Sequence, residues 1–471
     1  MTVTAHPEPL PSGSDGWRGE FAATLRLSWP LAAANLLQML TYAIDVIFIA
    51  RLGEQQLAAS ALAIALFGLV MWALSGLTGA VAPVAAAELG ERAPALRPVR
   101  RSVRMALWLA VASGFIGMGI CLLLGPLMRV TGQEPAIIGM AIEYNTLLVF
   151  SLIPFLINNV LRSFVSTLDR PIFATAITAG GIFVNAIANY AFIFGNFGAP
   201  EMGLRGAAVA TIITTLVTLA AYATAIRLDP RLHRYRIFGR LWSPDWQRFW
   251  HITRVGTPIA LTITAEAGIF GAAAFLMGKI GATQLAAHTV ALQIAALAFQ
   301  IPFGVGQAAT IRVGYFYGAR DSEGMKKAGW VGIAIGTGFM ATTAFAMILI
   351  PKPLLAIYID PWDPANAALV AFALKYIVVA AAFQLFDGMQ AVAAGALRGL
   401  QDTRVPMWIA AFSYWVPGIG LSIGLGFFTT LEGVGVWIGL ATGLVVAALL
   451  LTYRWARRDE LGLTAQPVRT Q

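Results

Sequence analysis

The sequence predicts an all-α integral membrane protein in which twelve transmembrane helices form two parallel six-helix lobes. Three observations support this fold class. The 471-residue chain is 58% hydrophobic and only 12% charged, which is about half the charge of a typical soluble domain. Apolar stretches of about 20 residues, long enough to cross a hydrocarbon core, recur from end to end. The two halves of the chain also repeat one another.

The first apolar stretch follows a polar N-terminal segment. Residues 1–20 contain Pro, Gly, Ser and charges of both signs, and they lack the basic start and short apolar core of a cleaved signal peptide. We therefore expect a flexible cytoplasmic tail before a first span at 27–50. The remaining spans are expected, in order, at 58–87, 103–125, 138–161, 171–195, 206–226, 254–278, 285–311, 328–350, 368–396, 407–428 and 434–454.

One long polar connection lies between the sixth and seventh spans. It runs from about Arg227 to Arg254 and contains seven arginines. This break predicts an N-terminal lobe at 21–227, a cytoplasmic inter-lobe linker at 228–253 and a C-terminal lobe at 254–456. Residues 457–471 are expected to form a second cytoplasmic tail.

The distribution of Lys and Arg predicts the orientation, because basic loops stay in the cytoplasm. If the N-terminus is inside, the segments on that side carry 26 of the 32 basic residues. Both termini are therefore expected in the cytoplasm. The six basic residues on the other side are Arg51, Arg129, Arg205, Lys279, Lys352 and Lys375.

An internal repeat relates the two halves at a constant offset of 228 residues. This offset aligns Pro30 with Pro258 and the Gln-Leu-Ala-Ala run at 56–59 with the same run at 284–287. Because each half has an even number of spans, both copies enter the membrane in the same direction. The pattern predicts parallel repeats, and transporters built from repeats place their site where the repeats meet.

Acidic residues inside spans cost about 2.5–3.5 kcal/mol at mid-membrane, so each is a functional candidate. In the first span, Asp45 ends a polar stripe on one helical face. The stripe faces either a cavity or a neighbouring helix that it contacts by hydrogen bonds. Two asparagines four residues apart in the fifth span complete a site with Asp45 or clamp the helices. The N-terminal candidates are Asp45, Asn35, Gln38, Tyr42, Asn185 and Asn189.

Two more acids lie in the C-terminal half. Glu266 is one turn after Thr262 in the seventh span, and Asp387 is in the middle of the tenth, between Gln384 and Gln390. No Lys or Arg is expected near the middle of any span. These carboxylates must therefore bind a proton, a metal cation such as Na⁺, or an organic cation.

Other polar residues have plainer interpretations. Gln293 is expected to line the cavity together with Gln384 and Thr262. His288 is expected to be a hydrogen-bonded residue near a helix end. Glu143 and Glu201 are expected at the outer interface, where water solvates them.

A close pair of buried carboxylates binds one positive charge well and two badly, because like charges and desolvation both oppose ionisation. An antiporter requires such competition, because its coupling ion and its substrate bind in turn. Entry of one monovalent cation supplies about 2.3 kcal/mol per 100 mV of membrane potential. The pattern therefore favours coupled transport.

These motifs resemble those of the MATE (multidrug and toxic compound extrusion) transporters, in their NorM-like bacterial branch, over about residues 20–456. The resemblance is carried by Asp45 followed by the segment 50–53, by Glu266 after 257–259, by the segments 300–309 and 312–314, and by Asp387 followed by 394–399 and 402–406.

The resemblance implies a V-shaped pair of bundles in the bacterial inner (plasma) membrane. It implies export of amphipathic, mostly cationic compounds in exchange for Na⁺ or H⁺ by alternating access. Glu266 and Asp387 match the C-lobe cation site, and Asp45, Asn185 and Asn189 match the N-lobe polar cluster. Asn189 stands where some relatives carry an aspartate. No cofactor besides the coupling ion is expected, and a monomer is expected to function.

Other function classes fit less well. The net charge of +9 does not indicate nucleic-acid binding, because the cations lie in loops. The single Cys121 excludes an intramolecular disulfide, and the four histidines form no paired metal motif, which disfavours an enzyme. A lipid-linked oligosaccharide flippase of the same superfamily would need a cationic cavity. A non-transporting receptor would have no evident use for the repeat or the acids.

Overall fold

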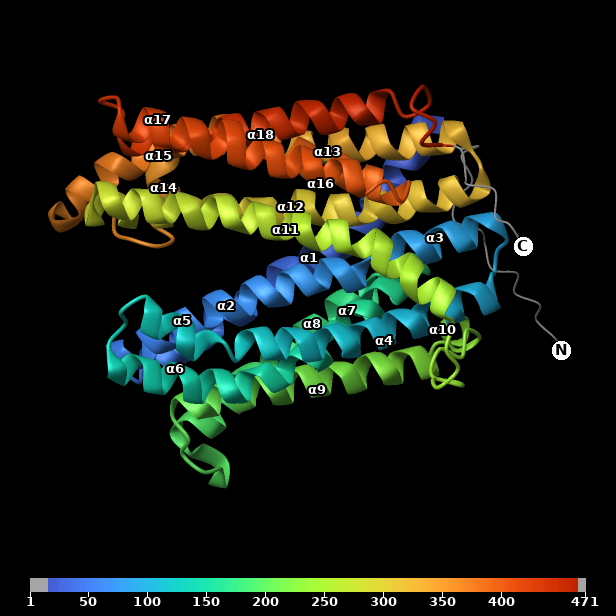
Figure 1. The fold of residues 1–471 in the computed structure, drawn as a ribbon, viewed down its shortest axis with the longest axis horizontal. Coiled ribbons are helices and arrows are strands. Elements are labelled where there is room, and N and C mark those ends of the chain that lie inside the picture. Colours follow the sequence, from blue (N-terminus) through green and yellow to red (C-terminus); the bar gives the residue numbers. More distant parts are fainter. Residues whose placement is uncertain (1–15, 465–471) are drawn as a thin grey trace. The chain divides into compact units, whose positions relative to one another are not determined.

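The computed structural model describes residues 16–464, and this part of the chain is helical and contains no strand (Figure 1). Twelve helical segments within it are long and apolar enough to cross a membrane. The all-α transmembrane fold class and the number of spans predicted from the sequence are thereby confirmed. The chain forms two compact units, each of which has most of its contacts within itself.

The described part of the first unit comprises residues 33–260. It contains the part of α1 (Gly16–Ala50) that begins at Ala33 and the part of α11 (Trp246–Ile280) that ends at Ala260. Between them lie α2 (Glu54–Gly79), α3 (Val81–Glu91), α4 (Leu96–Cys121), α5 (Leu124–Val130), α6 (Pro135–Leu148), α7 (Leu152–Thr167), α8 (Ile172–Phe194), α9 (Leu204–Leu228) and the short α10 (Pro230–His233).

The described part of the second unit comprises residues 16–32 and 261–464. After α11 it contains α12 (Ala282–Ala319), α13 (Ser322–Leu349), α14 (Pro351–Leu355), α15 (Ala367–Gly399), α16 (Arg404–Ser413), α17 (Ile419–Phe427) and α18 (Gly433–Ala456). A π-helical turn, Tyr414–Gly418, joins α16 to α17 and contains Pro417. Proline lacks the N–H that a regular α-helix requires, and π-turns often occur at functional sites.

The helix bounds follow the repeat found in the sequence. Together, α2 and α3 run from Glu54 to Glu91, and α12 runs from Ala282 to Ala319. Both ends are therefore displaced by the same 228 residues that align Pro30 with Pro258. The two halves share a scaffold as well as short motifs.

Aromatic side chains fill the interior of the second unit. Trp437 is fully buried, and its ring stacks on Tyr376 and Phe383 at centroid distances of 5.9 and 5.5 Å. Where α12 and α15 cross, Gly306 and Gly395 bring the backbones together, because a Cβ at Gly395 would lie 2.4 Å from the Gly306 carbonyl oxygen. Small residues permit such close packing in membrane helices.

The polar connection between the halves is docked on the first unit. Arg104 and Trp108 of α4 donate hydrogen bonds to the carbonyls of Arg240 and Leu241, at 2.6 and 2.8 Å. The Tyr235 hydroxyl donates to the Pro94 carbonyl at 2.8 Å. Burial raises the Tyr235 pKa to about 12, so the phenol keeps its proton. The connection lies at the end of α4 in Figure 1.

Two helices, α1 and α11, begin within segments that were expected to be a tail and a linker. Residues 16–20, expected in the flexible tail, form the start of α1, and Glu20 there is only 4% exposed. A buried ion pair described below explains this burial. α11 begins at Trp246, inside the segment expected as linker. The rest of the expected tails, residues 1–15 and 465–471, lies outside the described residues.

Candidate functional site

In the first unit, Asp45 is the centre of a buried polar cluster. Its carboxylate oxygen accepts hydrogen bonds from the Asn185 amide at 2.9 Å and the Asn189 amide at 2.7 Å. Asn189 also donates to the side-chain oxygen of Asn185 at 3.1 Å. The three side chains are between 0% and 7% exposed. The structure thus brings together α1 and α8 through the three residues that the sequence grouped.

The rest of the predicted α1 stripe has other partners. The Tyr42 hydroxyl donates to the Met71 sulfur at 3.2 Å, and Gln38 lies beside Tyr42. Asn35 accepts a hydrogen bond of 2.5 Å from Arg162 on α7. Within the described residues, Asp45 is the member of the stripe that forms hydrogen bonds with the asparagines of α8.

In the second unit, one amide joins the two predicted carboxylates. The Gln390 nitrogen donates to Glu266 at 3.4 Å and to Asp387 at 3.3 Å. A side-chain amide nitrogen has two hydrogens, so one nitrogen can serve both acceptors. The Tyr414 hydroxyl donates to the Gln390 oxygen at 3.0 Å and thereby fixes the amide orientation.

This second cluster lies within the helical interior. Asp387, Gln390 and Tyr414 are 6%, 4% and 0% exposed, whereas Glu266 is half-buried. Figure 1 places its helices α11, α15 and α16 in one bundle of the second unit. Among the described residues, no three or more His, Cys, Asp or Glu side chains are grouped so that they could hold a metal ion. A cation bound here would therefore have two carboxylates and neutral oxygen atoms as its ligands.

The sequence did not identify all members of this cluster. Gln390 stands three residues after Asp387, and that spacing was the available signal for its place on the same face. Tyr414 gave no signal, because its contact with Gln390 joins two successive helical segments and does not follow from the spacing within one helix. The π-turn that begins at Tyr414 is visible only in the structure.

No Lys or Arg was expected near the middle of a span, but the side chains of two arginines near helix ends lie close to polar groups inside the spans. Arg398, in the last turn of α15, lies close enough to Glu266 for their charges to interact. Arg162 reaches Asn35 from within α7. Both arginines were assigned to loops because they stand near span ends, but the helices continue past them and long side chains extend toward the polar groups.

The predicted cavity residues Gln384, Thr262 and Gln293 differ in burial and partners. Gln384 is fully buried, and its nitrogen donates to the Met347 sulfur at 3.7 Å. Thr262 is 9% exposed and one turn before Glu266. Gln293 is exposed and belongs to neither cluster.

His288 differs from its expected role. It is fully buried in the second turn of α12, and within residues 16–464 neither ring nitrogen has a hydrogen-bond partner. Its ring packs on Trp437 at a centroid distance of 5.4 Å. The expected hydrogen-bonded helix-end residue is therefore an aromatic packing residue, because α12 begins six residues before it.

The chain matches a known family along both halves. The model of the family described as MatE matches residues 30–191 and again residues 258–423. The two matches begin at Pro30 and Pro258, the prolines aligned by the internal repeat. The repeat found in the sequence is therefore also the repeat of the family.

Relatives and solved structures agree with this match. The chain is 45% identical over 446 residues to a probable multidrug resistance protein NorM of Mesorhizobium japonicum, covering 94% of this chain and 95% of the relative. It is 41% identical over 450 residues to a protein of the same description from Brucella suis, covering 96% of each.

The fold matches that of an outward-facing multidrug resistance MATE family transporter of the MOP superfamily, with a TM-score of 0.84 and 23% identity. The match covers 98% of this chain and 100% of the other. With the two family matches and two relatives above 40% identity, the chain belongs to the MatE family of multi-pass membrane transporters.

Proposed function

We propose that this protein is a secondary active multidrug efflux transporter that exports amphipathic, mostly cationic compounds in exchange for Na⁺ or H⁺. The observation that carries the proposal is the carboxylate pair of the second unit, in which Glu266 and Asp387 share the Gln390 amide. The descriptions of the relatives as multidrug resistance proteins support the substrate class. None of these descriptions favours a flippase.

The pair is suited to exchange because its charge is incompletely balanced. Gln390 supplies hydrogen bonds but no charge, and Arg398 supplies one positive charge near Glu266. A buried ion without a partner is unfavourable. One proton or Na⁺ would neutralise the remaining negative charge of the site. A second cation would then find no uncompensated negative charge. Binding of the coupling ion and of a cationic substrate would therefore compete.

The Asp45 cluster is the counterpart in the first unit. Its two amide donors satisfy the carboxylate by hydrogen bonds without neutralising it. Within the described residues, no ion pair includes Asp45. A cationic substrate or a proton would supply the missing charge. We therefore assign this cluster to proton or substrate binding, with Asp45, Asn185 and Asn189 as its residues.

The proposal includes a location and partners. The protein would lie in the bacterial inner membrane with both termini in the cytoplasm, as the excess of Lys and Arg in one set of loops indicates. It would act as a monomer on small organic cations, without a cofactor other than the coupling ion and without nucleic acid.

Efflux of ethidium from bacteria that lack their own multidrug pumps tests this function. Glu266→Gln and Asp387→Asn each remove one negative charge, so each should lower the efflux rate at least about tenfold relative to the wild type. Glu143→Gln is a matched control, because Glu143 is exposed and pairs with Arg205 on the surface. It should retain the wild-type rate. Wild-type efflux in both site variants, at equal amounts of protein in the membrane, would disprove the coupling site.

A further inference from the structure

Two helices belong to both compact units. Residues 16–32 of α1 pack with the second unit and its remainder with the first, whereas residues 246–260 of α11 pack with the first unit and its remainder with the second. The changes occur after Ala32 and after Ala260, which the 228-residue offset aligns. Each follows the aligned proline, Pro30 or Pro258, by two residues. The two repeats have therefore exchanged the first halves of these helices.

The first half of α1 is fixed in the second unit by a buried ion pair. Two nitrogens of Arg312 on α12 donate to the two carboxylate oxygens of Glu20 at 2.9 and 2.5 Å. The Glu20 and Arg312 side chains are 4% and 2% exposed. The Thr24 hydroxyl adds a hydrogen bond of 3.2 Å to Glu20. Such bidentate arginine–carboxylate pairs are stronger than ion pairs with a single hydrogen bond.

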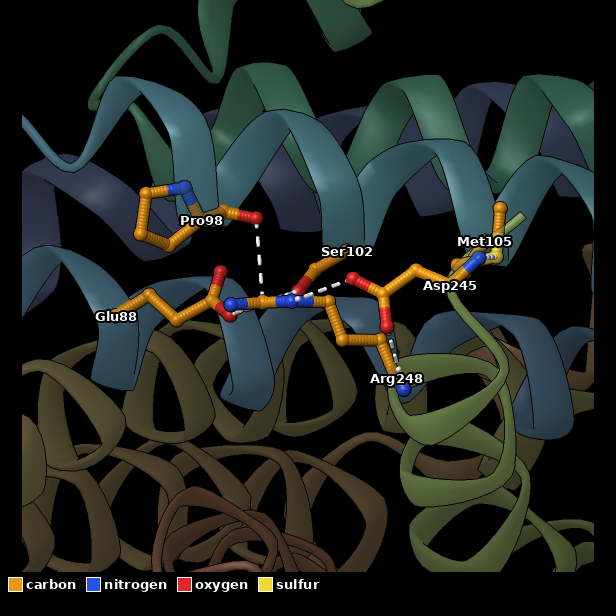
Figure 2. A network of polar contacts seen from close by, with 6 residues as sticks. All are labelled: Glu88, Pro98, Ser102, Met105, Asp245 and Arg248. Atoms are coloured by element: carbon orange, nitrogen blue, oxygen red, sulfur yellow. Dashed lines mark hydrogen bonds and ion pairs between the residues drawn. The ribbon is translucent and has the colours of Figure 1, made fainter. Parts of the chain in front are cut away.

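The first half of α11 is fixed in the first unit in the same manner. Arg248 forms an ion pair with Glu88 of α3 and donates to the Ser102 hydroxyl of α4 at 2.7 Å. Asp245 lies on its other side, at 3.3 Å. Figure 2 shows the guanidinium of Arg248 between the carboxylates of Glu88 and Asp245. Glu88 is almost completely buried, at 3% exposed.

The two ion pairs are equivalent in the repeat but opposite in polarity. Glu20 and Arg248 are aligned by the offset of 228, and Arg312 aligns one helical turn from Glu88. The exchanged half of α1 carries the carboxylate, whereas that of α11 carries the guanidinium. In its own repeat, each half would meet a like charge, Glu20 against Glu88 or Arg248 against Arg312. Like-charge contacts of this kind exclude the wrong partner.

Both exchanged segments pack closely against the backbone of a neighbouring helix. A Cβ added at Gly304 would lie 2.7 Å from the Ala32 backbone, and one added at Gly256 would lie 2.3 Å from the Leu77 carbonyl oxygen. Interfaces packed this closely move as one body rather than deform continuously. Each exchanged segment is therefore held by a buried ion pair and by close backbone packing.

The same two helices carry one acid of each proposed binding cluster beyond their prolines. α1 continues to Asp45 in the first unit, and α11 continues to Glu266 in the second. We propose that Glu20–Arg312 and Arg248–Glu88 are anchors through which each acid-bearing helix transmits ion or substrate binding to the opposite unit. The four residues are positioning residues, since they touch neither carboxylate cluster. This inference rests on the proposed antiport function.

Binding and transport measured separately on the full chain test the anchors. Glu20→Gln and Arg248→Gln remove the charge that holds one helix half. Each should bind ethidium within about twofold of the wild type, by fluorescence titration of purified protein, because both clusters are intact. Each should lower ethidium efflux at least about tenfold. The double variant Glu20→Arg with Arg312→Glu restores the pair with inverted polarity and should recover at least half of the wild-type rate.

A surface ion pair gives the matched control. Glu460→Gln removes the exposed pair with Arg457, whose side chains are 63% and 47% exposed, and should leave binding and efflux unchanged. The anchors are disproved if Glu20→Gln and Arg248→Gln transport within twofold of the wild type. They are also disproved if the inverted pair gives a monodisperse, ethidium-binding protein that does not transport. This second criterion decides the matter if the single variants fail to fold. Failure of the antiport itself would appear separately, as a wild type without efflux.

Discussion

Gln390 is the residue that turns two separate acids into one site. Its amide contacts both Glu266 and Asp387, and the Tyr414 hydroxyl holds it in place. Without these hydrogen bonds, the two carboxylates would keep their mutual repulsion and lose their shared donor. The contribution of such a hydrogen bond to a charged group is typically about 1.5–3 kcal/mol.

Replacement of this amide by a side chain of the same length provides a sharp test. Gln390→Met should lower the ethidium efflux rate at least about tenfold, because the acids lose their common donor while the packing volume is kept. The matched control is Gln300→Met, since the Gln300 amide donates to the Ala296 carbonyl of its own helix. Efflux from cells that express equal amounts of each variant is the measurement. An unaffected Gln390→Met would mean that the two acids act independently.

The acids could be predicted from the sequence, but most of their partners could not. Asp45, Glu266 and Asp387 stand out because a carboxylate inside an apolar span is unfavourable and therefore conspicuous. The contact between Asp45 and the asparagines of α8 followed from the resemblance and from residue type. The contact of Gln390 with Tyr414 joins separate helices, and no local pattern encodes it. The same holds for Arg398, which stands near a span end in the sequence.

The helices themselves were the most predictable feature. Each span is an apolar run bounded by polar residues, and the 228-residue repeat fixed the correspondence between the halves. The exchange of the first halves of α1 and α11 was not predictable. Pro30 and Pro258 stand inside continuous helices, so nothing in the local sequence indicates that one helix contributes to two units.

Packing between α12 and α15 gives a prediction for stability. Gly395 lies against the Gly306 carbonyl, and the Thr310 hydroxyl donates to the Gly395 carbonyl at 2.8 Å. Gly395→Val should destabilise the protein by about 1–3 kcal/mol, because the added carbons have no room. The thermal unfolding temperature of the detergent-solubilised protein is the measurement. Gly338→Val is the control, since nothing lies within 4 Å of its added Cβ. Equal unfolding temperatures for the two variants would contradict the close crossing.

The whole chain combines a symmetric scaffold with unequal chemistry. In the 228-residue alignment, Asp45 corresponds to Ala273 and Glu266 to Gln38. The first unit therefore has one acid held by two asparagines, and the second has two acids joined by a glutamine. Under the proposed function, the two repeats would therefore have different roles, and we expect the stronger cation site in the second unit. The fold and the family were evident from the sequence because hydropathy and repeat motifs extend over the whole chain.

The central claim is that the carboxylate pair couples export to an ion gradient. Purified protein in liposomes, loaded with ethidium and given an imposed Na⁺ gradient or an imposed pH gradient, tests it most directly. One of these gradients should drive ethidium movement against its own concentration difference in the wild type and the Glu143→Gln control, and neither should do so in Glu266→Gln or Asp387→Asn. Ethidium movement in the wild type that stops at equal concentrations under both gradients would contradict the account.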